Sequence, residues 1–216
     1  MILALGNRDD AERAAPVVRE HLARQGLLAY PTETVYGLGS AAEAGALARL
    51  AALKGREAGK PFLLLVSGRA MAERAGLVFT PAATAMAEAF WPGPLTLVLK
   101  GGEGKLPDAL RGREGGIAVR HTSHQAVARL LELLDQPLTS TSANRPGGAA
   151  APGPEQIVAL FRRAYDAGEL LVLDGGTLGN VPPSTIVDCT RSRAGLIREG
   201  ALPRAEIRRL VGRLAP

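Results

Sequence analysis

The sequence predicts an α/β protein built on an open sheet that mixes parallel and antiparallel strands. Short apolar runs alternate with amphipathic segments along most of the 216 residues, as strands and helices do in such folds. The last three apolar runs follow one another with loops alone between them, which favours antiparallel pairs. We expect one domain over residues 1–216, because neither a linker of domain size nor an internal repeat interrupts the pattern.

The first half of the chain predicts four strands and four helices. Strands are expected where the runs are apolar, at 2–5, 27–30, 62–66 and 95–100. The expected helices run to about residue 24 and over 41–53, 70–76 and 81–90. Pro16 must lie near the first turn of its helix or kink it, because proline lacks the N–H group that a helix interior uses.

The second half adds five strands and three helices, after a glycine-rich loop at 101–116. The strands are expected at 117–120, 137–142, 170–176, 184–190 and 195–199. The helices are expected over 124–134, 154–168 and 203–214. The glycines of loops 101–116 and 145–153 fit either mobile lids or disordered surface, and the sequence does not choose.

Composition narrows the class of protein. The formal charge is +5, and 22 of the 26 cationic residues are arginines, which favours an anionic partner such as a phosphate, a nucleotide or RNA. A scattered, solvated basic surface is the alternative. Cys189 is the one cysteine, so an internal disulfide is excluded, and its apolar surroundings predict a core position. We expect a cytoplasmic protein without a signal peptide or membrane span.

Polar side chains gather where the expected strands and helices end. Cations and hydroxyls together provide the donors that phosphate and carboxylate recognition uses. In open α/β sheets such groups meet in a crevice outside the strand ends, where we therefore expect the site. The hydroxyls are Thr32, Thr34, Ser140, Ser142, Ser184 and Thr185, and the cations are Lys54, Arg56, Lys60, Arg120 and Arg198.

Each local pattern also has an ordinary structural explanation. The PTET segment fits a helix N-cap, TSAN fits an asparagine turn, and the basic loop KGREAGK fits a solvated charge cluster. Their coincidence in one small protein favours a site. His121 and His124 lack a third ligand nearby, so we expect no metal on them. Glu33 and the other carboxylates show no acid–base spacing, and no catalytic serine motif is visible.

Six segments resemble, in order, the signature segments of the YrdC-like threonylcarbamoyl-AMP synthases. They are AYPTETVYGLG, LKGREAGKPF, WPGPLTLVL, AVRHTSH, TSAN and PPSTIVDCT, and the resemblance runs from about residue 27 to 198. The K-x-R and S-x-N pairs are the most specific of these marks. The resemblance implies an open, twisted sheet around a concave basic cavity, in the short, single-domain form of the family.

The resemblance also implies an activity and a set of site residues. The family forms threonylcarbamoyl-adenylate and pyrophosphate from L-threonine, bicarbonate and ATP, with Mg²⁺ on the ATP, and partner proteins transfer the product to tRNA. Its catalytic cations fall on Lys54 and Arg56. Its ATP contacts fall on Lys54, Arg56, Lys60, Ser142, Asn144 and Arg198, and a further one near Ala150, where a hydroxyl is missing here. Its threonine contacts fall on Thr34, Arg120, Ser140 and Ser184.

Two other functions remain open at this stage. A basic concave surface also suits a non-catalytic module that binds double-stranded RNA or tRNA through phosphate contacts. An enzyme of the same fold that uses another carbamoyl donor or acceptor is the third possibility. The joint presence of the K-x-R and S-x-N pairs with Arg120 and Ser184 favours the synthase, because RNA binding alone does not require them.

Overall fold

The computed structural model describes residues 1–55, 61–112, 114–212 and 214. The helices are α1 (Arg8–Ala23), α2 (Ala44–Lys54), α3 (Arg69–Arg74), α4 (Pro81–Phe90), η1 (Asp108–Leu110), α5 (Gln125–Leu134), α6 (Pro154–Leu160), α7 (Arg162–Asp166) and α8 (Arg204–Val211). The strands are β1 (Ile2–Ala4), β2 (Leu27–Tyr30), β3 (Gly37–Gly39), β4 (Leu63–Leu65), β5 (Leu77–Val78), β6 (Leu95–Gly101), β7 (Ile117–Arg120), β8 (Leu138–Ser142), β9 (Leu170–Asp174), β10 (Thr185–Asp188) and β11 (Gly195–Arg198).

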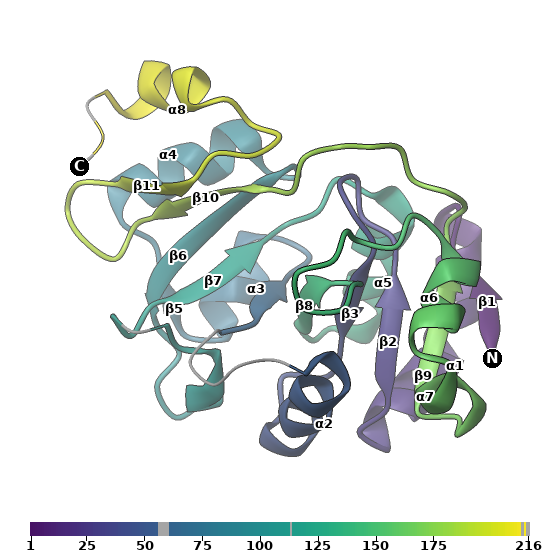
Figure 1. The fold of residues 1–216 in the computed structure, drawn as a ribbon. Coiled ribbons are helices and arrows are strands. Elements are labelled where there is room, and N and C mark those ends of the chain that lie inside the picture. Colours follow the sequence, from purple (N-terminus) through teal and green to yellow (C-terminus); the bar gives the residue numbers. More distant parts are fainter. Residues whose placement is uncertain (56–60, 113, 213, 215–216) are drawn as a thin grey trace.

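The strands form one open, mixed sheet, which confirms the predicted fold class. Its order is β1-β9-β2-β3-β8-β4-β7-β6-β10-β11, and β5 pairs with β6 outside this path. Strand β9 lies parallel between β1 and β2, whereas β3, β8 and β4 are joined by antiparallel pairs. The sheet thus begins beside the N-terminus and ends at β10 and β11, with α4 and α8 nearby (Figure 1).

Alternation along the strands divides the apolar side chains between two cores. Leu27 and Ala29 of β2 join the larger core, which takes in buried residues of α2, α3, α4 and α6. Leu28 and Tyr30, which point to the opposite face, join a second core with α1 and α5. Successive residues of a strand point to opposite faces, so a continuous apolar run such as LLAY indicates a strand covered on both sides.

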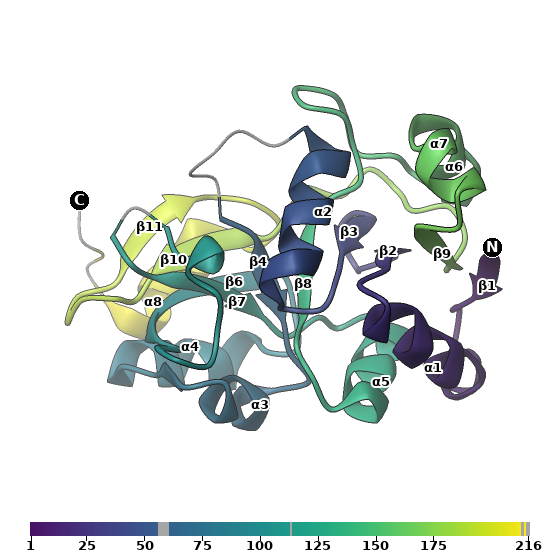
Figure 2. The ribbon, with the colours of Figure 1, turned by 90° about the horizontal axis from the view of Figure 1, so that it is seen from below.

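Helices α1 and α5 pack against each other and cover one end of their sheet face (Figure 2). Leu138 of β8 is buried beneath them. Ser140 and Ser142 follow on the same face of β8 but line a cavity instead. This face is therefore covered at one end and hollow towards the other, as far as the described residues show.

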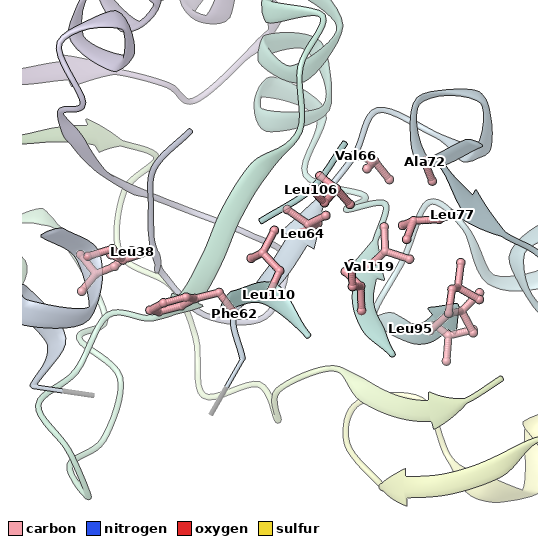
Figure 3. Packing of buried hydrophobic residues seen from close by; sticks show 14 of the residues in the cluster. Leu38, Phe62, Leu64, Val66, Ala72, Leu77, Leu95, Leu106, Leu110 and Val119 are labelled. Carbon is pink, nitrogen blue, oxygen red and sulfur yellow. The ribbon is translucent and has the colours of Figure 1, made fainter. Parts of the chain in front are cut away.

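The larger core fills the opposite face of the sheet. Leu64 of β4, Val119 of β7 and Leu95 of β6 lie close together in it, and Leu106 and Leu110 add side chains from the glycine-rich segment (Figure 3). Burying a leucine side chain contributes about 1.5–3 kcal/mol relative to leaving it exposed. Burial of these two leucines therefore anchors residues 102–112 to the larger core.

The structure departs from the predicted elements at several points. The helix expected over 154–168 is two helices, α6 and α7, that meet at Phe161, a residue buried in the larger core. Pro16 lies in the middle of α1, not near its first turn. Helix α1 is nonetheless well anchored at its start, where Asn7 and Asp10 form a reciprocal capping box. None of the helices in the described part of the chain is long and apolar enough to cross a membrane.

Strand β3 was not predicted, because GLG lacks the branched or aromatic residues that indicate strands. Here glycine is required by close packing. A Cβ atom on Gly39 would lie 2.0 Å from the Thr139 carbonyl oxygen, and one on Gly37 would lie 2.9 Å from Ser140 Oγ. The two glycines let β3 approach β8 and the Tyr30 ring, which brings the segment between β2 and β3 next to the hollow face.

We predict that Gly39→Ala destabilises the protein by about 1–3 kcal/mol, because the added methyl group overlaps a backbone carbonyl that cannot move independently. Urea denaturation measures this change. Gly179→Ala is the control, since a Cβ atom at Gly179 would have nothing within 4 Å. Equal stability of the two variants would contradict the packing explanation for β3.

Candidate active site

The hollow half of the sheet face holds a cavity of about 940 Å³. Each of three strands of the sheet contributes two side chains to its floor. The two residues of each pair are two positions apart along their strand, so they point to the same face. These pairs are Thr96 and Val98 on β6, Ala118 and Arg120 on β7, and Ser140 and Ser142 on β8. The floor thus combines a polar part with an apolar part on one rigid support.

Irregular segments form much of the rest of the cavity wall. Residues 149–152 line it from one loop and residues 178–183 from another. The two loops are joined by a hydrogen bond from Leu178 N to the Pro152 carbonyl oxygen, at 2.8 Å. Ala150 is among the lining residues. It has no hydroxyl group, so it can offer a ligand only its backbone and a methyl group.

The structure brings most of the predicted site residues together. Arg56 and Lys60 lie outside the described residues, which leaves eight of the ten. Six of these eight line the cavity, namely Thr34, Arg120, Ser140, Ser142, Ser184 and Arg198. Lys54 and Asn144 do not line it, but each forms a hydrogen bond within the turn that begins at Ser142.

The expected place of the site was partly wrong. We expected a crevice outside the strand ends, but the alternating residues show that the cavity lies on the face of the sheet. Thr185 also differs from the expectation. Its hydroxyl donates to the Leu202 carbonyl oxygen at 2.5 Å and accepts from Gly200 N at 2.8 Å, so Thr185 fastens the segment after β11. The expected basic character remains a prediction, since Arg56 and Lys60 are not described.

Arg120 forms a buried ion pair that the sequence did not reveal. Its side chain is 4% exposed, and its Nη2 atom lies 2.6 Å from Glu33 Oε1. These two atoms do not meet the geometry of a hydrogen bond, so the contact is an ion pair between opposite charges. Thr122 Oγ1 donates to the other oxygen of Glu33. Glu33 and Arg120 are 87 positions apart along the sequence, and spacing gave no sign of the pair.

The surroundings of Glu33 keep its carboxyl group charged. Burial alone would raise the pKa of Glu33, but the positive charge of Arg120 and the hydrogen bond from Thr122 outweigh burial and hold that pKa below its ordinary value. A buried arginine stays protonated, so it needs such a counter-charge. Glu33 is the group that supplies it here.

The ion pair changes what Arg120 can offer a ligand. Its Nε donates to the Gly93 carbonyl oxygen at 3.2 Å, and its Nη1 donates to Thr34 Oγ1 at 3.2 Å. A guanidinium that grips a carboxylate with two parallel bonds uses Nη2 in either arrangement, and Nη2 is buried against Glu33. Arg120, which the resemblance implies as a threonine contact, therefore cannot hold a carboxylate by this two-bond grip in this structure.

Hydroxyl groups connect the remaining polar residues of the cavity. Ser184 Oγ lies 2.8 Å from Thr96 Oγ1, so β6 and the start of β10 share a hydrogen bond. Arg198 Nη2 donates to the Ser184 carbonyl oxygen at 2.8 Å. Partial burial, together with the charge of Arg120, lowers the pKa of Arg198 from its usual value, which still leaves a cation.

Lys54 fastens the turn after β8. It is the last residue of α2 and is 6% exposed, whereas we had expected an exposed cation on a loop. Its Nζ donates to the carbonyl oxygens of Ser142 at 2.6 Å and Asn144 at 2.7 Å, and also to Asn144 Oδ1. Ser142 Oγ donates to the same Asn144 Oδ1 at 2.7 Å. The lysine and the S-x-N pair therefore form one structural unit beside the cavity.

Two residues that the sequence analysis did not place in the site, His124 and Cys189, have structural roles. His124 is the N-cap of α5, and its Nδ1 accepts from Val127 N at 3.4 Å. Cys189 is buried in the larger core, and burial raises the pKa of its thiol to about 12, which confirms a core position. Within the described ranges, no group of three or more His, Cys, Asp or Glu side chains is placed to hold a metal ion.

The cavity residues belong to segments that a protein family shares. A family model described as telomere recombination, the Sua5/YciO/YrdC model, matches residues 20–200. The match covers well over half of the chain. The chain belongs to this family. The Sua5/YciO/YrdC match contains every predicted site residue, from Thr34 to Arg198.

Several curated relatives of the chain are named threonylcarbamoyl-AMP synthase. Threonylcarbamoyl-AMP synthase of Thiobacillus denitrificans is 36% identical over 185 residues, which are 85% of this chain and 95% of that protein. The Chromohalobacter salexigens protein of the same name is 39% identical over 84% of this chain and 95% of its own length. Against the synthase of Pyrococcus abyssi, at 33% identity, the chain spans 54% of the relative's length.

Solved structures share the fold. The Pyrococcus abyssi Sua5 protein in complex with L-threonine superposes with a TM-score of 0.84 at 30% identity, over 99% of this chain and 62% of that one. Escherichia coli YciO superposes with a TM-score of 0.76 at 26% identity, over 94% of this chain and 95% of its own. Both comparisons agree with the open, mixed sheet.

We predict that Lys54→Met lowers the free energy of unfolding by about 1–3 kcal/mol, because it leaves partly buried carbonyl oxygens without their donor. Replacing an exposed loop cation would instead change the stability negligibly. Urea denaturation decides between them, and Lys100→Met, at an exposed position of β6, is the control.

A second prediction concerns the Glu33 carboxylate, whose ordinary pKa is 4.5. Because the folded pKa of Glu33 is lowered, its stabilising effect is complete above the unfolded value and is lost as the pH falls through the folded value. The difference in unfolding free energy between the wild type and Glu33→Gln should therefore be constant above about pH 7 and shrink below pH 4.5. Between these limits the difference should rise as the pH falls, because the charge of Glu33 raises the pKa of His121 and of His124 in the wild type alone. A difference independent of pH down to about pH 3 would contradict the charged pair.

Proposed function

We propose that the protein is an L-threonylcarbamoyladenylate synthase, which forms threonylcarbamoyl-AMP and pyrophosphate from L-threonine, bicarbonate and ATP. The observation that carries this proposal is the convergence of six predicted site residues in one cavity. Family membership and the shared name of the curated relatives support it. We treat residues 1–216 as one domain that contains the whole site.

The reaction joins two steps. The amine of threonine and bicarbonate first give an N-carboxy-threonine with loss of water. An oxygen of the new carboxylate then attacks the α-phosphorus of ATP, the bond from that phosphorus to the bridging oxygen breaks, and pyrophosphate leaves. Negative charge spreads over phosphoryl oxygens in the second step, so cations and fixed geometry should supply most of the catalysis.

We assign the polar part of the floor to threonine. Thr34, Arg120, Ser140 and Ser184 line the cavity together, and their side chains are at most 6% exposed. Buried hydroxyls of this kind discriminate well against analogues that lack a matching polar group, because an unmatched site is left unpaired. Arg120 contributes charge here without the two-bond grip.

We assign the neighbouring part of the cavity to ATP. Ser142 and Arg198 line it, Asn144 is held beside it by Lys54, and the alanines at 149–151 leave room at the wall. The assignment keeps Lys54, Arg56 and Lys60 as ATP contacts, with Lys54 and Arg56 as the catalytic cations. Lys54 donates hydrogen bonds to the Ser142 turn in this structure, so a contact with phosphate requires its ammonium to exchange some of these bonds.

The Mg²⁺ that accompanies ATP would be held mainly by phosphate oxygens and water. The donor set supports this arrangement, because hydroxyls and arginines dominate the polar lining among the described residues. The carboxylate of Glu33 is already paired with Arg120, one of these arginines. When bound, the ion would offset phosphate charge.

The binding module for double-stranded RNA or tRNA is the second candidate. The identically named relatives, at up to 39% identity, favour the synthase instead. Contact with tRNA, partner proteins that transfer the threonylcarbamoyl group and a cytoplasmic location remain proposals that follow from the proposed activity.

The decisive assay mixes the purified protein with ATP, L-threonine and bicarbonate and measures pyrophosphate and threonylcarbamoyl-AMP. Product should appear when all three substrates are present and vanish when any one is left out. Arg56→Ala should lower the rate by about a hundredfold or more, because a transition-state cation is lost. Arg163→Ala, on the exposed side of α7, is the control. RNA binding without adenylate formation would instead favour the binding module.

A further inference from the structure

A line of polar groups runs from Glu33 into the cavity. Glu33 pairs with Arg120, and Arg120 Nη1 donates to Thr34 Oγ1 at 3.2 Å. Thr34 Oγ1 lies 3.0 Å from Thr32 Oγ1, which in turn donates to the Val35 carbonyl oxygen at 2.7 Å. Glu33 itself is fixed by the hydrogen bond from Thr122. Every member of the line is thus held at two points.

The Thr34 hydroxyl oxygen is held from two sides. Arginine has donors alone, so Thr34 Oγ1 accepts from Arg120 Nη1. Thr32, 3.0 Å away on the other side, is itself fixed, because its Oγ1 accepts from the backbone N–H groups of Thr34 and Val35 at 3.2 Å each. The position of the Thr34 hydroxyl therefore depends on Arg120.

We propose that Glu33 is a positioning residue: it holds Arg120, and through Arg120 it fixes the place of the Thr34 hydroxyl in the cavity, where that hydroxyl contacts L-threonine. The proposal rests on the proposed synthase function and goes beyond it by assigning a role to Glu33. Glu33 does not touch the substrate, because Arg120 and Thr122 occupy its two oxygens.

Two groups of L-threonine carry a hydrogen that the Thr34 oxygen could receive, namely the amine and the side-chain hydroxyl. The amine still carries an N–H after it has been carboxylated, so a contact between Thr34 and the amine can persist through both steps.

The experiment compares L-threonine and ATP binding in the full chain by titration calorimetry, together with the KM values for both substrates. Glu33→Gln and Thr34→Val should each weaken L-threonine binding by about 10–100-fold and change ATP binding by less than about twofold. Glu33→Asp and Thr34→Ser should recover much of the loss, because they keep the charge and the acceptor. Glu73→Gln, in the exposed Arg69–Glu73 pair, is the matched control.

L-2-Aminobutyrate, which lacks the hydroxyl of threonine, separates the two possible donors. If the amine meets Thr34, Thr34→Val weakens the binding of both amino acids by a similar factor. If the hydroxyl does, the variant weakens the binding of L-threonine alone. Thr122→Val is a further test at the far end of the line, in case Glu33→Gln folds poorly, and it should weaken L-threonine binding by a smaller factor.

Unchanged L-threonine binding in a folded Glu33→Gln variant would overturn the proposal. So would an equal loss of L-threonine and ATP binding, which would mean a general structural role for Glu33. A wild-type protein that binds neither L-threonine nor ATP would contradict the proposed function itself, and the inference with it. These outcomes are distinct, because the first two require a wild type that binds L-threonine.

Discussion

The uneven covering of one sheet face is the constraint on which the rest of this structure depends. Helices α1 and α5 pack over Leu28, Tyr30 and Leu138 at one end, and the cavity occupies the same face farther along. The opposite face is filled by the larger core, which makes the floor of the cavity rigid. A strand such as β8 therefore changes from apolar to hydroxyl-bearing residues where it leaves the cover of the helices.

The charge buried in this floor needs a partner in the same protein. Arg120 lies on a central strand with 4% of its side chain exposed, where an unpaired guanidinium would be costly. Glu33 compensates it from the segment between β2 and β3, and that segment comes close because Gly37 and Gly39 have no side chains. The same glycines thus explain both an unexpected strand and the place of the ion pair.

The nucleotide side of the cavity is supported in a different way. A helix end, α2, brings Lys54 to the turn after β8, and three oxygen atoms of that turn receive its hydrogen bonds. Lys54 of the K-x-R pair thus meets the S-x-N pair, which is distant from it in sequence. Support of this kind fixes Ser142 and Asn144 before any ligand arrives, which reduces the ordering cost of binding.

The sequence by itself determined the mixed α/β class, most of the strands and helices, and the six cavity residues, because apolar periodicity and shared motifs are local properties of the chain. The tertiary structure alone decided that the site lies on a sheet face, that Lys54 is buried and that Glu33 pairs with Arg120. Each of these depends on residues far apart in sequence that meet after the sheet has formed. Strand β3 shows the same limit, since its glycines are explained by contacts with Thr139 and Ser140 and not by any local preference for a strand.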